Sequence, residues 1–517
     1  MRSSGLRRFL LDKRGNVALV TALSLGPICL AGLGAADLAR ATSAKVQLQD
    51  AIDAAALAAA RTNATTDAQL KVAGDKYLRQ NLALGQDFVL TASDFKFGPG
   101  GTVQGTARLD VHPFVAGLMN GGTMAVGASS EVVRADMKVE IALVLDNTGS
   151  MTEGTKLADM KTAAKNFVTK MEEASNKAVE ANSVRISLVP FSNTVRIDGT
   201  TYRYSSWIDQ TGSSPINDEI FTTASGTQHA DRFALFSNLG VTWRGCVEMR
   251  KAPYDVQDTA PTSGATLYTP YFAVDEPDSR SSGYGSDYQN DYVDDGEKKS
   301  VTNWRIRQGS ITKYGGSKKG TMSNTYGPNK GCELQKIIRL STDFAGLRTA
   351  IDNLNAAGNT NIPIGLAWGW NTITPNPPFA DGVAYGTAKY KKIIVLMTDG
   401  ENTMDQRDTP NDGTYAGTGY IWQGRVLKAD GSPLPQGASD AERTAALDSR
   451  MALLCTNMKN KQIDIYAIGV EVGSSSVTQL KACASGADHF YDVKSSSTLS
   501  AAFDSIAGQI AALHLSR

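Results

Sequence analysis

Three short segments of the sequence carry side-chain oxygens in a spacing suited to a divalent cation. Asp146, Thr148 and Ser150 occupy alternate positions of one polar loop that directly follows an apolar run. Thr360, in Gly-Asn-Thr-Asn, adds a hydroxyl, and Asp399, in Thr-Asp-Gly after a second apolar run, adds a carboxylate. Hard cations such as Mg²⁺, Mn²⁺ or Ca²⁺ prefer oxygen ligands, and Mg²⁺ requires a near-octahedral set. These side chains therefore predict a metal site with one coordination position left open.

The surrounding pattern predicts the elements that position these residues. Buried strands are predicted from four apolar runs, at 139–145, 185–191, 392–398 and 463–470. Helical patterns alternate with them, at 156–173, 344–354, 362–370, 441–458 and 499–512. Such alternation is typical of an α/β domain with a doubly wound, mostly parallel, Rossmann-like sheet. Ligands of open α/β sheets bind at the carboxyl ends of the strands, which is where Asp146 and Asp399 stand.

The alternation stops between about residues 195 and 336, which hold ten of the 17 Tyr and few apolar runs. We expect a large insertion in the α/β domain, too polar for a solid core of its own and ordered by its host and a disulfide. An acidic stretch from Asp275 to Glu297 is expected to be a solvated loop. Trp368 and Trp370 are expected to pack against the sheet.

Composition restricts the classes of function. The 517 residues include 52 Lys plus Arg and 52 Asp plus Glu, so a net charge of zero argues against a nucleic-acid-binding protein. The sequence has no G-x-S-x-G or H-E-x-x-H motif, and its four His are scattered. We therefore expect a binding protein and no enzyme. Two alternatives remain open: a phosphoryl-transfer enzyme that uses the Asp146 loop, and an inert structural spacer.

The N-terminal region predicts a membrane anchor. Residues 17–36 carry no charge and are long enough to cross a bilayer. Five basic residues precede them, which predicts a cytoplasmic N-terminus: Arg2, Arg7, Arg8, Lys13 and Arg14. A cleaved secretory signal is the competing interpretation. The anchor is favoured because an apolar stripe at helical spacing continues beyond the span, at Leu38, Ala41, Leu48, Ile52, Ala55 and Ala59.

Four parts are predicted along the chain. They are a cytoplasmic tail at 1–15, a transmembrane helix at 16–37, a helical stalk with a small strand-rich unit at 38–135, and the α/β domain at 136–517. Beyond the span the cysteines number four, which allows three disulfide connectivities, and free thiols are the alternative. We favour Cys246 with Cys332 and Cys455 with Cys483, because each pair lies within one region.

The cation-binding residues resemble the metal-ion-dependent adhesion site of von Willebrand factor A domains. In that family a D-x-S-x-S loop, a Thr and an Asp hold the cation, and a carboxylate of a protein partner completes the coordination. The resemblance implies ligand roles for Asp146, Thr148, Ser150, Thr360 and Asp399. Thr148 departs from the usual Ser, and its additional methyl group could tighten the site or alter its cation preference.

A second resemblance involves the N-terminal segment. Arg14-Gly-Asn-Val-Ala18 and the Ala-rich residues 48–58 resemble the membrane segment of TadG-like proteins of the tight-adherence (Flp) pilus assembly machinery. Segments similar to other such proteins follow at 243–248, 270–277, 327–332 and 366–370. This resemblance implies a single-pass protein of the bacterial inner membrane, with most of the chain in the periplasm. Its expected partners are pilus or pilus-assembly components.

Overall fold

The computed structural model describes residues 16–62, 64, 66–82, 88–98, 102–113, 122–133, 137–178, 181–223, 226–227, 229–278, 288–295 and 304–515. The five basic residues that precede the apolar segment lie outside this range, as do Asp287 and Glu297. Two compact units are present, one formed chiefly by residues 1–136 and one chiefly by residues 137–511.

The N-terminal unit begins with the helix α2 (Asn16–Ala60), which has 45 residues. In its first half large apolar side chains are exposed, among them Leu23 and Ile28. Its segment Val20–Ala60 is long and apolar enough to cross a membrane, judged by length and composition. The structure confirms that one helix continues from the apolar segment into the following stripe.

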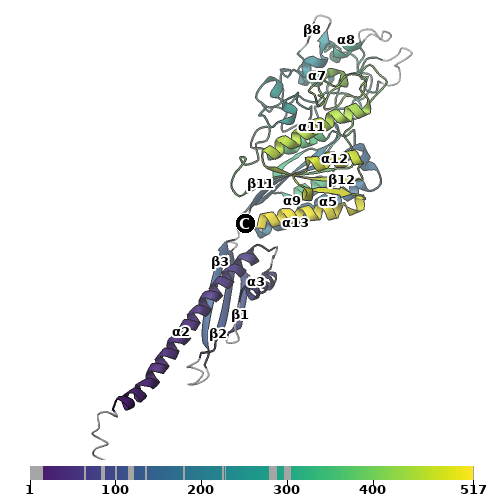
Figure 1. The fold of residues 1–517 in the computed structure, drawn as a ribbon. Helices are drawn as coiled ribbons and strands as arrows, with labels where there is room; N and C mark the ends of the chain where they lie inside the picture. The colour runs from purple at the N-terminus through teal and green to yellow at the C-terminus, as the bar shows by residue number, and fades with distance from the viewer. Residues whose placement is uncertain are drawn as a thin grey trace, which may run out of the picture. The chain divides into compact units, whose positions relative to one another are not determined.

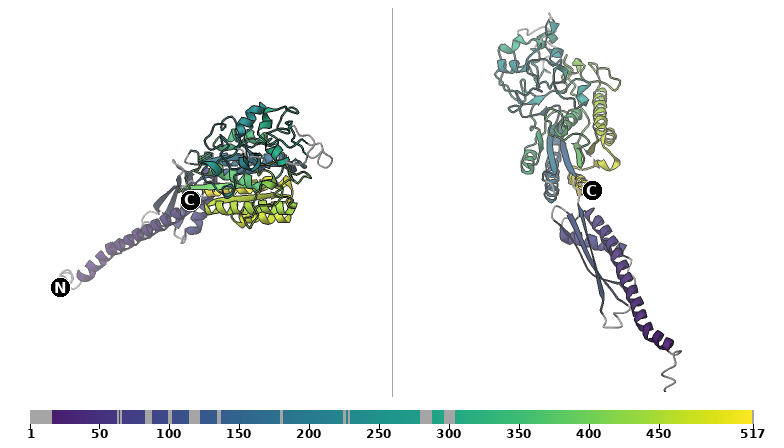
Figure 2. Two further views of the ribbon diagram at one scale, coloured as in Figure 1. Left: turned by 90° about the horizontal axis from the view of Figure 1, so that it is seen from above. Right: turned by 90° about the vertical axis from the view of Figure 1, so that its left-hand side faces the viewer.

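The second half of α2 packs on an antiparallel sheet and a second helix, α3 (Asp67–Asn81). The strands β1 (Phe88–Phe97), β2 (Thr102–Val111) and β3 (Met124–Val133) form the sheet in that order and lie along α2 (Figure 2). Four predicted stripe residues are fully buried here, at Leu48, Ile52, Ala55 and Ala59. Leu38 differs, because it is 63% exposed.

The C-terminal unit is built on a sheet of six strands in the order β10-β5-β4-β11-β12-β13. All neighbouring strands run parallel except the edge pair β10 and β5. The mixed α/β class with a mostly parallel sheet is confirmed. The strand bounds are β4 (Lys138–Asp146), β5 (Val184–Phe191), β10 (Ile338–Ser341), β11 (Tyr390–Thr398), β12 (Ile463–Val470) and β13 (Phe490–Val493).

Helices cover both faces of this sheet (Figure 1). One buried cluster joins the sheet to α10 (Ile362–Ile373), α11 (Asp440–Asn460) and α12 (Ser474–Cys483). A second cluster joins the opposite face to α5 (Lys156–Lys177), α9 (Phe344–Asp352) and α13 (Leu499–Leu515). Strands covered on both sides need apolar residues at nearly every position, which explains the continuous apolar runs in the sequence.

The Tyr-rich segment lies between the neighbouring strands β5 and β10. Its aromatic rings pack against one another, with Phe236 against Phe272 and Phe272 against Tyr314. These rings belong to one buried cluster with residues of the host domain, and Cys246 is bonded to Cys332, which agrees with the expectation that the host and a disulfide order the insertion. Single aromatic residues from distant segments supply these contacts, and apolar runs do not reveal them. Its short elements are β6 (Val195–Arg196), α6 (Asn217–Ile220), β7 (Thr222–Thr223), β8 (Gly226–Thr227), α7 (Arg232–Leu239), β9 (Cys246–Val247) and α8 (Trp304–Gly309).

Trp368 connects the aromatic rings of the insertion to the host domain. Its ring contacts Trp207 and Tyr268 of the insertion, with the Tyr268 centroid 4.7 Å away. The helix α10 approaches the sheet through small residues instead, because a Cβ on Gly369 would lie 2.5 Å from Val144. The prediction that Trp368 packs on the sheet therefore needs correction: its ring packs between helix and insertion.

The acidic stretch is also different from the solvated loop that we expected. Asp275, Glu276 and Asp278 are buried. Asp275 forms an ion pair with Lys313 at 2.9 Å, and Asp278 pairs with Lys319. Ion pairs with cationic residues later in the chain therefore compensate the desolvation of these carboxylates. Because those cations lie outside the acidic stretch, its local charge pattern could not predict the ion pairs.

Both favoured disulfides are confirmed. Cys246 is bonded to Cys332 within the insertion, and Cys455 of α11 is bonded to Cys483 of α12. Cys29 is a free, exposed cysteine on α2.

Candidate metal centre

Asp146 lies at the carboxyl end of β4 and has no exposed surface. Its Oδ1 accepts a hydrogen bond from the backbone N–H of Thr148 at 2.8 Å. Its Oδ2 accepts one from the hydroxyl of Thr398, the last residue of the adjacent strand β11, at 2.6 Å. These two bonds hold the carboxylate at the point where the two central strands end.

A chain of hydroxyl groups connects this loop to Asp399. The Thr148 and Ser150 hydroxyl oxygens lie 3.0 Å apart, and the Ser150 hydroxyl donates to Asp399 Oδ1 at 2.7 Å. The Asp399 side chain has no exposed surface. The structure therefore brings Asp146, Thr148, Ser150 and Asp399 together at one edge of the sheet.

Thr360 reaches the same place from the loop before α10. A Cβ on Gly400 would lie 3.7 Å from the Thr360 hydroxyl and 3.9 Å from the Ser150 hydroxyl, so both line the space beside Gly400. Backbone hydrogen bonds join this loop to the first one, since Gly149 N–H donates to the Gly358 carbonyl at 2.9 Å. Gly358 has a φ of 79°, a left-handed conformation that glycine adopts without strain.

Lys156, in the first turn of α5, adds a positive charge to this group. Its ammonium donates to Asp399 Oδ2 at 3.1 Å and to Glu153 at 2.9 Å. Burial lowers the pKa of Lys156, but the hydrogen bonds to Glu153 and Asp399 outweigh burial and raise it. The sequence predicted no role for Lys156 at this site, whereas its ammonium contacts Asp399.

The charge of Asp399 disfavours the charged form of Asp146. Burial, then the charge of Asp399, raise the pKa of Asp146 from 3.8 to about 6, against the hydrogen bonds from Thr148 and Thr398. Lys156 neutralises one of the two negative charges, so Asp146 and Asp399 retain a surplus. A buried surplus of negative charge is the electrostatic condition that a bound cation relieves.

The donor chemistry fits a hard divalent cation. The predicted ligands present carboxylate and hydroxyl oxygens, which Mg²⁺, Mn²⁺ and Ca²⁺ prefer. Among the described residues no group of three or more His, Cys, Asp and Glu forms a metal-binding cluster, and the predicted ligand set accordingly combines two carboxylates with hydroxyls. The sequence did not predict that Thr398 and Thr403 form hydrogen bonds to the candidate ligands. Thr403 receives the Thr360 backbone N–H at 2.9 Å, and only the folded chain reveals this contact.

Comparison with known proteins identifies the N-terminal segment. Residues 15–62 match the profile of a family described as putative Flp pilus-assembly TadE/G-like. The predicted resemblance to this family is confirmed for the N-terminal segment, residues 15–62. No curated protein matches the sequence at a significant level.

Several solved structures share features of the fold. The pilus adhesin SpaC from Lactobacillus rhamnosus GG is 13% identical, with a TM-score of 0.35, and the match covers 83% of this chain and 36% of SpaC. The vWF domain of the type V pili tip protein Mfa5 from Porphyromonas gingivalis is 13% identical, with a TM-score of 0.34, covering 72% of this chain and 95% of that domain. Proximal thread matrix protein 1 from the mussel byssus, with a zinc-occupied MIDAS motif, is 11% identical, with a TM-score of 0.28, covering 74% and 47%. These likenesses are too remote to transfer the role of any residue.

Proposed function

We propose that this chain is a membrane-anchored, metal-dependent binding component of tight-adherence (Flp) pilus assembly. Its metal centre would hold Mg²⁺, or another divalent cation, through Asp146, Thr148, Ser150, Thr360 and Asp399. The open coordination position would then bind an acidic side chain of a protein partner among the pilus components. The role is binding, without catalysis.

One observation carries the metal-binding part of this proposal. Asp146 and Asp399 arrive from the ends of two adjacent central strands, and the hydroxyls of Thr148 and Ser150 lie between them. A buried pair of carboxylates lined with hydroxyls is costly unless a cation is present. Metal binding would therefore stabilise this edge of the sheet and leave a Lewis-acidic position toward solvent.

The N-terminal match supports the location and the process. We assign residues 16–37 to a single span with a cytoplasmic N-terminus in the bacterial inner membrane, and residues 38–135 to a stalk. Residues 136–517 form a doubly wound, von Willebrand A-like domain in this proposal, with the insertion at about 195–336. The family match supports the pilus process, and the length of α2 supports the anchor.

Calorimetric titration of the full chain in lipid nanodiscs with Mg²⁺ and Mn²⁺ tests the metal site. We expect saturable binding that Asp146→Asn weakens by about 100-fold or more, because one charged ligand is lost while the shape is kept. The matched control is Asp430→Asn, since Asp430 is 65% exposed and should leave binding unchanged.

Absence of saturable binding to the folded wild-type chain would overturn the metal-dependent mechanism. Tryptophan fluorescence provides the folding check, because all six Trp lie between residues 207 and 422.

A further inference from the structure

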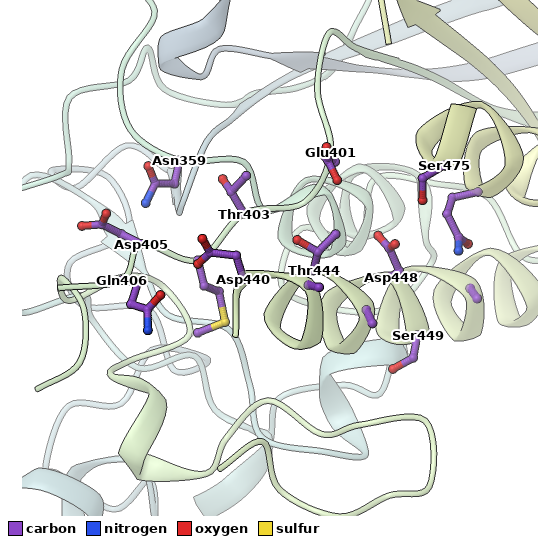
Figure 3. A pocket seen from close by; sticks show the side chains of 15 residues that line it. Asn359, Glu401, Thr403, Asp405, Gln406, Asp440, Thr444, Asp448, Ser449 and Ser475 are labelled. Atoms are coloured by element: carbon purple, nitrogen blue, oxygen red, sulfur yellow. The ribbon is translucent and has the colours of Figure 1, made fainter. Parts of the chain in front are cut away.

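A groove with a volume of about 1000 Å³ is lined by residues that include Asn359 and Glu401 (Figure 3), which are close in sequence to the candidate ligands Thr360 and Asp399. One wall is the first half of α11, where Asp440, Thr444 and Asp448 recur every four residues and therefore share one helix face. The opposite wall is the segment after β11, which includes Glu401 and Thr403. A volume of this size is at the upper end of the range of about 300–1,000 Å³ for pockets that bury drug-sized ligands, so it can hold a long side chain.

The groove carries a surplus of negative charge. Four of its lining residues are acidic, and no Lys, Arg or His is among the described residues that line it. Asp405 is paired with Arg407 at 2.7 Å, whereas Glu401, Asp440 and Asp448 form no ion pair within the described part of the chain. Burial raises the pKa of Asp448, the hydrogen bond from Asn402 lowers it, and the charge of Glu401 raises it further. The negative charge of Glu401 thus acts on Asp448.

Apolar side chains line the groove together with these carboxylates. Ala441, Ala445 and Ala452 of α11 line the groove, together with Met404. Lys and Arg side chains have a long aliphatic stem and a charged head group, and they bury the stem on apolar surface while the head remains polar. Alanines next to carboxylates offer both kinds of contact.

Hydrogen bonds connect the groove directly to the metal centre. Thr403 receives the Thr360 backbone N–H at 2.9 Å and returns its own N–H to the Thr360 carbonyl at 2.8 Å. Asn402 donates to Asp448 at 2.8 Å. The segment 399–403 therefore has a metal-ligand candidate at one end and groove residues at the other. A partner segment bound at the metal would extend naturally along this groove.

We propose that the groove binds a Lys or Arg side chain of the same protein partner whose acidic side chain coordinates the metal. This inference rests on the proposed function and specifies the chemistry of the partner, a peptide segment with an acidic residue and a basic residue close together. The bond between the cation and the partner's carboxylate provides most of the affinity. The acidic groove then favours those acidic segments that also carry a Lys or Arg.

Selection of random peptides displayed on phage tests the pairing, with the full chain in nanodiscs and Mg²⁺ present. We expect the wild-type chain to enrich peptides that contain both Asp or Glu and Lys or Arg. A variant with Glu401→Gln, Asp440→Asn and Asp448→Asn should retain the acidic enrichment and lose the basic one. Binding of a selected peptide should weaken by about tenfold or more in this variant at low salt.

The matched control changes the same charge elsewhere. Glu173→Gln, Asp430→Asn and Asp488→Asn replace three carboxylates that do not line the groove, and both Asp side chains are more than 60% exposed. This control should keep both enrichments. Glu401→Gln alone, in an exposed loop position, provides a second variant with little risk to folding.

The results separate the two proposals. If only the basic enrichment appears, and chelation of Mg²⁺ leaves it intact, the metal mechanism fails while the groove remains supported. If peptides show no basic enrichment, or if the triple groove variant retains it, the groove proposal is overturned. Unchanged Mg²⁺ titration of the groove variant would show that the lost peptide binding is not a loss of the metal.

Discussion

Charged side chains are buried at both ends of the central strands β4 and β11. Positive charge is in excess at the amino ends, and negative charge is in excess at the carboxyl ends. At their amino ends Glu140 lies in register with Arg185 of β5 and Lys392 of β11, and it accepts hydrogen bonds from both. At their carboxyl ends the charge of Asp399 acts on Asp146, and one ammonium, that of Lys156, pairs with Asp399. One carboxylate meets two cations at the first end, whereas the second end has two carboxylates and one cation.

This difference distinguishes a structural cluster from a binding site. The amino-end cluster has its carboxylate fully used, since Glu140 also accepts the Val383 backbone N–H at 3.0 Å. Burial lowers the pKa of Lys392, Glu140 raises it, and the nearby Arg185 lowers it again, so the positive charge is in excess. The carboxyl end has the opposite excess together with hydroxyl donors, which is the arrangement that a cation from solution completes.

Removal of the acid at the amino end should have the largest effect. Glu140→Ala leaves the buried Lys392 and the partly buried Arg185 without their carboxylate, and we expect the free energy of unfolding to fall by about 3–5 kcal/mol. Urea unfolding followed by tryptophan fluorescence measures the loss. Glu140→Gln should lose less, because it keeps an acceptor for Val383. A loss below about 1 kcal/mol for the Ala variant would contradict the structural role of this cluster.

Removal of an acid at the carboxyl end should affect binding more than folding. For Asp399→Asn we expect Mg²⁺ affinity to fall by about 100-fold, which equals about 2.7 kcal/mol. Without Mg²⁺ the same variant should unfold at nearly the wild-type urea concentration, because it also relieves repulsion from Asp146. Calorimetry and urea unfolding measure the two quantities. A large loss of stability in metal-free buffer would remove the distinction between the two ends.

Lys156 provides a further test of the carboxyl end, because its ammonium already pairs with Asp399. Lys156→Met removes a positive charge that competes for Asp399, and Mg²⁺ affinity should rise by about tenfold, or about 1.4 kcal/mol. Lys165→Met is the matched control, since Lys165 pairs with Asp352 away from this loop. Unchanged or weaker Mg²⁺ binding in the Lys156 variant would show that its ammonium does not compete with the cation.

The partly exposed ion pair of Lys336 and Asp198 is a reference for the stability effects expected at the two buried ends. The hydrogen bond from Lys336 and those from the Thr201 and Thr200 backbone lower the pKa of Asp198 from 3.8 to about 2. The carboxylate then stabilises the fold above the unfolded pKa of 3.8, and this contribution disappears as pH falls through about 2. The side chains of Lys336 and Asp198 are 43% and 29% exposed, so we expect Asp198→Asn to cost only about 1 kcal/mol at neutral pH.

Urea unfolding of this variant and the wild type at neutral pH and near pH 3 provides the measurement. The difference between them should shrink at the lower pH, because the unfolded carboxyl is then largely protonated. A constant difference would assign the loss to the hydrogen-bonding shape of the side chain and not to its charge.

Several elements were predictable because they depend on local patterns. Continuous apolar runs predicted β4, β5, β11 and β12, and helical spacing predicted α5, α9, α10, α11 and α13. The short edge strands β10 and β13 and the helix α12 were missed. Edge strands are buried on fewer sides, so their sequences lack the long apolar run that marks a central strand.

The residues of the candidate site could be predicted from the sequence, but the contacts between them could not. Loop spacing and position after an apolar run indicated Asp146, Thr148, Ser150, Thr360 and Asp399. The contact between Lys156 and Asp399 joins positions 243 residues apart, and the one between Thr360 and Thr403 spans 43. The fold of the sheet produces these contacts, and no local spacing encodes them.

The sequence by itself determined the long apolar helix, the parallel sheet, the pairing of cysteines within one region and the oxygen donors at strand ends. These features follow from hydrophobic periodicity and side-chain chemistry, which act over a few residues. Only the tertiary structure decided which buried carboxylates form an ion pair with a cation and which do not. Electrostatic energy depends on distance and burial in space, so Asp275 is paired with Lys313 and Asp399 with Lys156, whereas the carboxylate of Asp146 is held by Thr148 and Thr398.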